Sequence, residues 1–230
     1  IPGFLINSLT DKLLKHEMDG YRRTQQPHPF FEAKGYSHLV PLDHPELEDW
    51  TDSLQFGASP AKYNTVHEPT NILFGGGIDD MFLNTETGEF HCVDYKSTAA
   101  SSWGFREEIT LDGKYKQGYK RQMDMYVWIG KQRGLPMSDE SFFLYVDGQN
   151  SSPAGDKLEG MYLDTSGAAQ LLFHSTLIPY VADDSWVEPA LFGVKETLEK
   201  SVCPPHSEKC EYGAYLDSAW RESTPNVSGR

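Results

Sequence analysis

The stretch of sequence that decides the fold runs from Gly77 to Lys96 and is GIDDMFLNTETGEFHCVDYK. Its two halves are largely apolar segments of strand length, and the residues between them, from Asn84 to Gly88, favour a turn. The stretch therefore predicts a β-hairpin. A loop over residues 85–88 places Asn84 opposite Glu89, and this choice sets the register of the whole hairpin.

In this register Asp79 faces Asp94, with β-carbons about 5 Å apart, where like charges destabilise a sheet. Lys96 lies two residues beyond Asp94 and so points to the same face. A divalent cation explains the two carboxylates, because Mg²⁺ prefers carboxylate and water oxygens together with phosphate oxygens. A lysine beside the cation can orient or deprotonate a water for phosphodiester attack. The alternative is a surface Asp–Lys pair with Asp79 turned elsewhere.

Around the hairpin, the hydrophobic pattern predicts an α/β chain with a mixed sheet flanked by helices. The first helix is expected to begin at Ser8, with Asp11 three residues later completing a capping box. The other predicted helices cover residues 45–54, 114–132 and 186–200. The other predicted strands cover residues 65–68, 72–74, 142–146, 157–163 and 169–178, and residues 24–44 are expected to be irregular.

Three elements in order carry a resemblance to a known family: Gly76-Gly77-Ile78-Asp79, then Val93-Asp94-Tyr95-Lys96-Ser97, then Gln122 with Tyr126 on the following helix. Together they resemble the PD-(D/E)XK nuclease superfamily. The resemblance is to its RecB-like branch, which includes CRISPR-associated RecB-like exonucleases, and covers roughly residues 5 to 150. It implies a restriction-endonuclease-like mixed central sheet flanked by helices in one domain, residues 1–230, with an insertion around 24–60.

The resemblance also implies roles for particular residues. Asp79, Asp94 and the backbone carbonyl of Tyr95 would hold Mg²⁺ or Mn²⁺, and Lys96 would serve the attacking water. Asp11 is the nearest candidate for a further ligand on the first helix, although a capping role explains it equally well.

Gln122 and Tyr126 would face the site and help to place the lysine or the substrate. The alternative is a stripe of side chains on this helix, including Tyr115 and Tyr119, that simply packs on the sheet.

The charge is unevenly distributed along the chain. The net charge is −14, which argues against a general nucleic-acid coat or a membrane-surface binder. From Lys114 to Arg133, however, six basic residues accompany one acid, Asp124. Lys116, Lys120 and Arg121 would contact DNA phosphates from this helix. The alternative is a solvated helix face.

The C-terminal tail, residues 203–230, resembles the iron–sulfur tail of many RecB-like nucleases in a degenerate form. Gly213 occupies an expected ligand position, and Cys203 and Cys210 cannot build a four-thiolate cluster even with Cys92. An iron–sulfur cluster is therefore not expected in this chain: it has been lost, or is split by missing N-terminal residues. A zinc site from Cys203, His206 and Cys210 is the alternative. Cys92 is expected to be a buried small apolar side chain.

Three cysteines suit a reducing, cytoplasmic setting. No apolar run is long enough for a membrane span, and no secretory signal is expected after Ile1-Pro2-Gly3.

The leading hypothesis is a metal-dependent deoxyribonuclease, exonuclease-type, acting in DNA repair, recombination or defence. The first alternative is a catalytically inactive nucleic-acid-binding module on the same fold. The second is an acidic regulatory protein whose carboxylates bind Ca²⁺, against which the lack of an Asp-rich loop of EF-hand type argues.

Overall fold

The computed structural model describes residues 5–99, 104–152, 154, 156–157 and 165–207, and in the tail residues 210, 212–213, 215–216 and 218–219. Its centre is a five-stranded sheet in the order β1-β4-β5-β6-β7. The strands are β1 (Leu39–Pro41), β4 (Asp80–Asn84), β5 (Phe90–Ala99), β6 (Glu140–Gly148) and β7 (Phe173–Val181). β5 and β6 run parallel, whereas the other neighbours are antiparallel, so the sheet is mixed as predicted.

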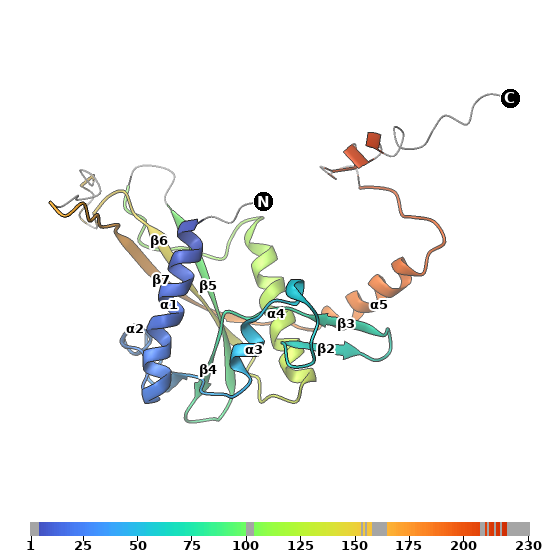
Figure 1. Ribbon diagram of the computed structural model, residues 1–230, viewed down its shortest axis with the longest axis horizontal. Helices are drawn as coiled ribbons and strands as arrows, with labels where there is room; N and C mark the ends of the chain where they lie inside the picture. Colours follow the sequence, from blue (N-terminus) through green and yellow to red (C-terminus); the bar gives the residue numbers. More distant parts are fainter. Residues whose placement is uncertain are drawn as a thin grey trace.

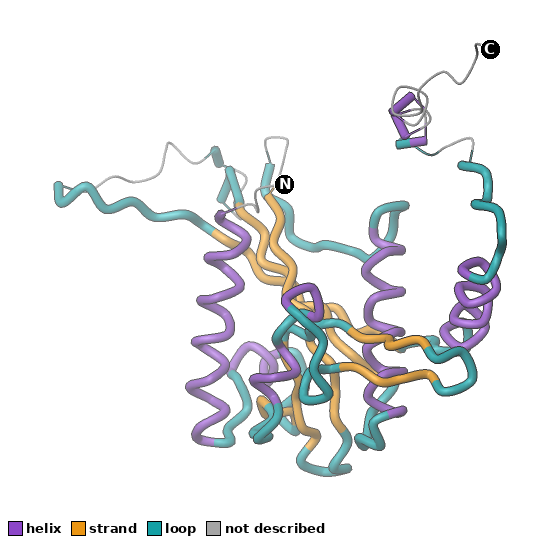
Figure 2. The backbone as a smooth tube through the Cα atoms, turned by 45° about the vertical axis from the view of Figure 1, so that its right-hand side comes forward, coloured by secondary structure: helices purple, strands orange, loops and turns teal. Residues whose placement is uncertain are grey.

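Two long helices cover opposite faces of this sheet (Figures 1 and 2). Helix α1 (Leu5–Thr24) packs with Val93 and Tyr95 of β5, whereas α4 (Lys116–Gln132) packs with Cys92 of the same strand. Because successive side chains of a strand point to opposite faces, β5 contributes alternately to two apolar cores. The expected α/β architecture with flanking helices is therefore confirmed.

The remaining elements surround this framework. They are α2 (Pro29–Ala33), α3 (Leu47–Thr51), a short 3₁₀ turn (Leu54–Phe56), the two-stranded hairpin of β2 (Asn64–His67) and β3 (Ile72–Gly75), and α5 (Val187–Leu198). Within the described residues, no helix is both long enough and apolar enough to cross a bilayer.

The predicted hairpin register is confirmed. Asp80 pairs with Val93 and Leu83 with Phe90, as expected when Asn84 faces Glu89. Asn84 holds the turn, because its Oδ1 accepts hydrogen bonds from the N–H groups of residues 86 and 87 at 2.9 and 3.2 Å. Gly88 closes the turn at φ +78°, a backbone conformation that glycine adopts without strain.

Several predicted boundaries differ from the structure. Helix α1 begins at Leu5 rather than Ser8, so the predicted capping box is wrong, and the side chain of Asp11 pairs with Lys15 at 3.1 Å instead. The strand predicted from residue 169 begins at Phe173. Most of the predicted strand 157–163 lies outside the described residues.

Residues 24–60, expected as an insertion with an irregular first part, contain α2, β1 and α3. Strand β1 joins the main sheet beside β4, because three apolar residues, 39–41, are buried there.

Candidate active site

The candidate site lies where β4 separates from β5. Pairing between these strands extends to Asp80 and Val93, while β5 continues to Ala99 with β6 on its other side. Among the described strands, none pairs with this second half of β5 on the β4 side. The resulting edge lies between α1 and α4 (Figure 2), and the predicted catalytic side chains gather along it.

Asp79 and Asp94 meet at this edge. Oδ2 of Asp79 accepts a hydrogen bond from the backbone N–H of Tyr95 at 2.8 Å, which places it beside the neighbouring Asp94. Asp94 is only 3% exposed. Burial raises its pKa to about 7, the Lys96 ammonium opposes that rise, and the Asp79 carboxylate adds to it. The structure therefore brings the two predicted carboxylates together.

Lys96 lies on the same face as Asp94, as predicted from its position two residues further on. Its Nζ is 2.5 Å from Oδ2 of Asp94, an ion pair in which that buried oxygen has no hydrogen bond of good geometry. Nζ also donates to Oε1 of Gln122 at 3.5 Å and lies 4.8 Å from the centre of the Tyr119 ring. The ammonium is thus held between the carboxylate and helix α4.

Gln122 and Tyr126 join α4 to the segment that precedes β4. Nε2 of Gln122 donates to the Tyr126 hydroxyl at 2.8 Å, and that hydroxyl donates to the carbonyl of Gly77 at 2.6 Å. A β-carbon on Gly76 would lie 2.9 Å from a ring carbon of Tyr126, so glycine is needed for this approach. Gln122 faces the site as predicted. Tyr126 fits both expectations, because its hydroxyl reaches Gln122 and Gly77 while its ring is buried in the core beneath α4, whereas Tyr115 is exposed.

Helix α1 approaches Asp79 from the other side. Nζ of Lys15 is 3.8 Å from Oδ1 of Asp79 and 3.1 Å from Oδ1 of Asp11. The candidate ligand Asp11 therefore reaches the site through a lysine rather than beside the two carboxylates. Within the described part of the chain, no three His, Cys, Asp or Glu side chains come together as a metal-binding group.

Sequence reasoning missed a buried network that supports the site from the α1 face. Asp80 accepts hydrogen bonds from Nη2 of Arg22 at 2.9 and 3.0 Å, from the Tyr95 hydroxyl at 2.6 Å and from the N–H of Met81 at 2.7 Å. The network ties α1 to the residues that follow Asp79 and Asp94. The available signal was an acid directly before the apolar residues 81–83, together with an arginine in the last turn of the first helix.

On the α4 side, the structure adds the missed cation Arg106 beside the predicted Lys116. Arg106 makes two hydrogen bonds, at 2.6 and 2.5 Å, to the buried carboxylate of Asp147. Lys116 donates to the Tyr145 hydroxyl at 2.7 Å and lies 4.1 Å from the centre of that ring. Burial lowers the pKa of Lys116, and the nearby cations Arg106 and Lys96 lower it further.

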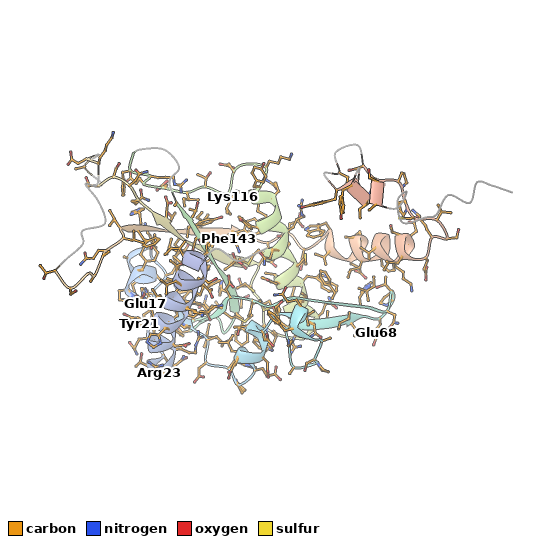
Figure 3. The ribbon with its side chains drawn as sticks, turned by 45° about the horizontal axis from the view of Figure 1, so that its top comes forward. Glu17, Tyr21, Arg23, Glu68, Lys116 and Phe143 are labelled. Atoms are coloured by element: carbon orange, nitrogen blue, oxygen red, sulfur yellow. The ribbon has the colours of Figure 1, made fainter. Side chains whose placement is uncertain are left out.

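The three residues predicted to contact phosphates occupy different positions along α4. Lys116 lies at the amino-terminal end of the helix (Figure 3), near Arg106 and Lys96. Lys120 is half-buried and Arg121 is exposed further along the same helix.

The described residues of the tail lie beyond α5, on the side of α4 away from α1 (Figure 1). Cys203 is exposed, Cys210 is half-buried, and a β-carbon on Gly213 would lie 3.0 Å from that of His206. Cys92 is instead buried in the core beneath α4, where burial raises its thiol pKa to about 12. The prediction that Cys92 is a buried apolar side chain is confirmed.

Comparisons with known proteins identify no relative. No family model matches the sequence, and neither the curated proteins nor the solved structures contain a significant match. The chemistry of the site itself must therefore carry any functional conclusion.

Proposed function

We propose that this protein is a metal-dependent nuclease of the PD-(D/E)XK type that hydrolyses DNA phosphodiester bonds. The observation that carries the proposal is the convergence of Asp79, Asp94 and Lys96 at the open edge of β5, where the buried Asp94 carboxylate lies between the Asp79 carboxylate and the Lys96 ammonium. A buried carboxyl such as Asp94, whose pKa is raised by burial and by a second carboxylate, is typical of functional sites. Such an arrangement lowers folding stability, so its presence points to a role other than stabilising the fold.

The donor set fits Mg²⁺ or Mn²⁺. Asp79 and Asp94 would supply carboxylate oxygens, and the Tyr95 carbonyl would add a third ligand. In a strand, the N–H and C=O of one residue point to the same edge, and the N–H of Tyr95 reaches Asp79. Bound there, the ion would supply Lewis acidity toward a phosphate oxygen and would lower the pKa of a bound water.

Lys96 would orient or deprotonate the attacking water. Hydrolysis joins the water oxygen to phosphorus, breaks one P–O ester bond and leaves the departing oxygen to take up a proton. As an ammonium, Lys96 would orient the water; to accept the water proton, Nζ would first pass its own proton to the Asp94 carboxylate 2.5 Å away. Gln122 and Tyr119 limit where Nζ can point, since one accepts its hydrogen bond and the other offers its ring. Tyr126 acts as a positioning residue by holding Gln122 and Gly77.

DNA would follow the basic side of α4. Lys116 lies near both Lys96 and Arg106, the latter already paired with Asp147, and Lys120 and Arg121 follow about one turn further along the helix. With a net charge of −14, the rest of the protein repels a polyanion, which would confine DNA to this surface. The proposal includes exonuclease-type action in repair, recombination or defence.

The test is a nuclease assay on single- and double-stranded DNA in Mg²⁺, Mn²⁺, Ca²⁺ or chelator. We expect cleavage with Mg²⁺ or Mn²⁺ and a loss of about 100-fold or more in Lys96→Ala. Lys195→Ala is the matched control, because Lys195 is a half-buried lysine on α5 that pairs with Glu199 and lies outside the site. Cleavage that persists in chelator, or in Lys96→Ala, would overturn the proposal.

One observation favours the alternative of a catalytically inactive nucleic-acid-binding module. Lysines already neutralise both carboxylates, Lys15 near Asp79 and Lys96 beside Asp94, without any cation. A binding module predicts DNA binding that is equally tight with Mg²⁺ and with chelator, and no cleavage under either condition. Electrophoretic mobility shifts measured beside the nuclease assay separate the two functions.

A further inference from the structure

We propose that Lys15 is an exchangeable counter-ion of Asp79: its ammonium occupies the cation position on this carboxylate until a divalent cation displaces it, and Asp11 then retains the displaced lysine. This inference rests on the proposed metal-dependent function. Lys15 thereby sets how tightly the protein binds its cation, and Asp11 acts on the lysine instead of on the metal.

Asp79 turns one of its two oxygens toward helix α1. Its Oδ2 accepts the hydrogen bond from the backbone N–H of Tyr95 at 2.8 Å, which fixes that oxygen against β5. Its Oδ1 is 3.8 Å from Nζ of Lys15. Oδ1 is therefore the oxygen that meets a cation, and the cation that it meets is the Lys15 ammonium.

The two lysines beside the carboxylates are held with different strength. Nζ of Lys96 is 2.5 Å from Asp94, whose side chain is only 4% exposed, so separating this pair would leave a buried charge without its partner. The side chains of Lys15 and Asp79 are 34% and 27% exposed. Ion pairs that are open to solvent contribute little to stability, so a competing cation displaces Lys15 more easily than Lys96.

Asp11 gives Lys15 a second carboxylate partner. It lies one helical turn before Lys15, and its Oδ1 is 3.1 Å from Nζ, closer than Oδ1 of Asp79. An acid four residues before a lysine forms a favourable pair on a helix. Lys15 can therefore release Asp79 without losing its only counter-charge, and it remains beside the site after the exchange.

A cavity beside Asp79 has room for the displaced side chain. Lys15 and Asp79 both line this cavity, which has a volume of about 440 Å³ and lies between α1, the residues around α3 and the start of β4. Arg22 lines it as well, but two hydrogen bonds to the buried Asp80 hold its guanidinium in place. Lys15, which has only ion pairs with partly exposed carboxylates, is the cation of this lining that can move.

The first test titrates Mn²⁺ into the full chain without DNA and measures the free ion by electron paramagnetic resonance. Lys15→Gln should tighten Mn²⁺ binding by about threefold, because the ion no longer competes with an ammonium. Lys12→Gln is the matched control, since Lys12 is an exposed lysine on the same helix, and it should change the affinity much less. Asp79→Asn should weaken binding and remove the effect of Lys15→Gln.

A double-mutant cycle separates an action of Asp11 through the lysine from direct binding of the ion. Asp11→Asn removes the alternative partner of Lys15, so it should weaken Mn²⁺ binding. In the Lys15→Gln background the same change should have little effect, because no lysine remains to be retained. Equal weakening in both backgrounds would mean that Asp11 binds the ion directly, which would overturn the inference.

The other outcomes separate the inference from the proposed function. Equal Mn²⁺ affinities of the wild type and Lys15→Gln would overturn the inference, and so would equal tightening by Lys15→Gln and Lys12→Gln, which would reflect net charge alone. If Mg²⁺-dependent cleavage persists in that case, only the inference fails. Exchange at Asp79 without any cleavage would overturn only the nuclease function. Mn²⁺ binding confined to Lys15→Gln would mean that Lys15 replaces the cation permanently, and both would fail.

Discussion

The carboxylate of Asp124 in α4 accepts a hydrogen bond from the indole nitrogen of Trp186 at 2.9 Å, across 62 residues of sequence. The same side chain also accepts hydrogen bonds from the Tyr180 hydroxyl at 2.8 Å and from the N–H of Asp183 at 3.0 Å. The lone acid of a basic helix is thus buried and structural. It fastens the end of β7 and the start of α5 to the helix that carries Gln122.

Replacing Asp124 should destabilise the protein. Asp124→Ala leaves three donors without their acceptor, and hydrogen bonds to a charged group contribute about 1.5–3 kcal/mol each before relaxation. We expect a loss of about 3 kcal/mol in the free energy of unfolding, measured by urea denaturation. Asp49→Ala, at an exposed position on α3, should change it by less than about 0.5 kcal/mol. Similar small losses in both variants would contradict an anchoring role.

The stability of Asp94→Asn should depend on pH in a defined direction. A carboxyl whose pKa rises from 3.8 to about 7 on folding penalises the folded state increasingly between those pH values. In chelator, the variant should therefore match the wild type near pH 4. At pH 8 it should be more stable by on the order of 1 kcal/mol. Thermal melting across this pH range measures the difference, and a variant less stable at pH 8 would indicate a structural Asp94.

Added Mg²⁺ should stabilise the wild type much more than Asp94→Asn. A ligand that binds only the folded state raises stability by mass action, and the amide is a poorer ligand than the carboxylate. Asp94→Asn should also abolish Mg²⁺-dependent cleavage. Equal Mg²⁺-induced shifts in melting temperature would show that Asp94 is not a ligand.

Neutralising Lys116 and Lys120 should weaken the salt dependence of DNA binding. Each phosphate contact contributes a slope of about −0.9 on duplex DNA, or −0.7 on single strands, to log K against log salt. The double variant Lys116→Gln/Lys120→Gln should flatten the slope by about one to two units, by fluorescence anisotropy at several salt concentrations. Lys195→Gln/Lys200→Gln on α5 and just beyond it is the control. An unchanged slope in the α4 variant would show that Lys116 and Lys120 face solvent and do not contact DNA phosphates.

The purified protein should be colourless. Cys92 is buried in the core with a raised pKa, so only the thiols of Cys203 and Cys210 are available in the tail. Visible absorption and iron and sulfide analysis check this expectation. A stoichiometric iron–sulfur content would require a ligand outside this cysteine set.

The sequence predicts well where structure is local. The turn from Asn84 to Gly88 determines the hairpin register, and the register alone brings Asp79 to Asp94. Local pattern also misled at the first helix, because Ser8 and Asp11 have capping-box spacing although the helical turn begins at Leu5. A capping motif inside a helix cannot be distinguished from one at its start when the preceding residues also favour helix.

Pairings between residues far apart in the sequence could not be predicted from local patterns. Arg22 and Asp80 are 58 residues apart and meet only because α1 docks on the sheet. The pairing of Arg106 with Asp147 depends equally on a loop returning to the end of β6.

The close contact between Gly76 and Tyr126 restricts which residues evolution can place at position 76. A β-carbon at Gly76 would meet a ring that two hydrogen bonds hold in place, so either the ring or the segment that leads to Asp79 must shift. An alanine at this position would disturb the placement of Asp79 relative to Lys96 and Gln122 without changing any of these three residues. We therefore expect homologues that keep the polar residues but lack this glycine to be catalytically inactive.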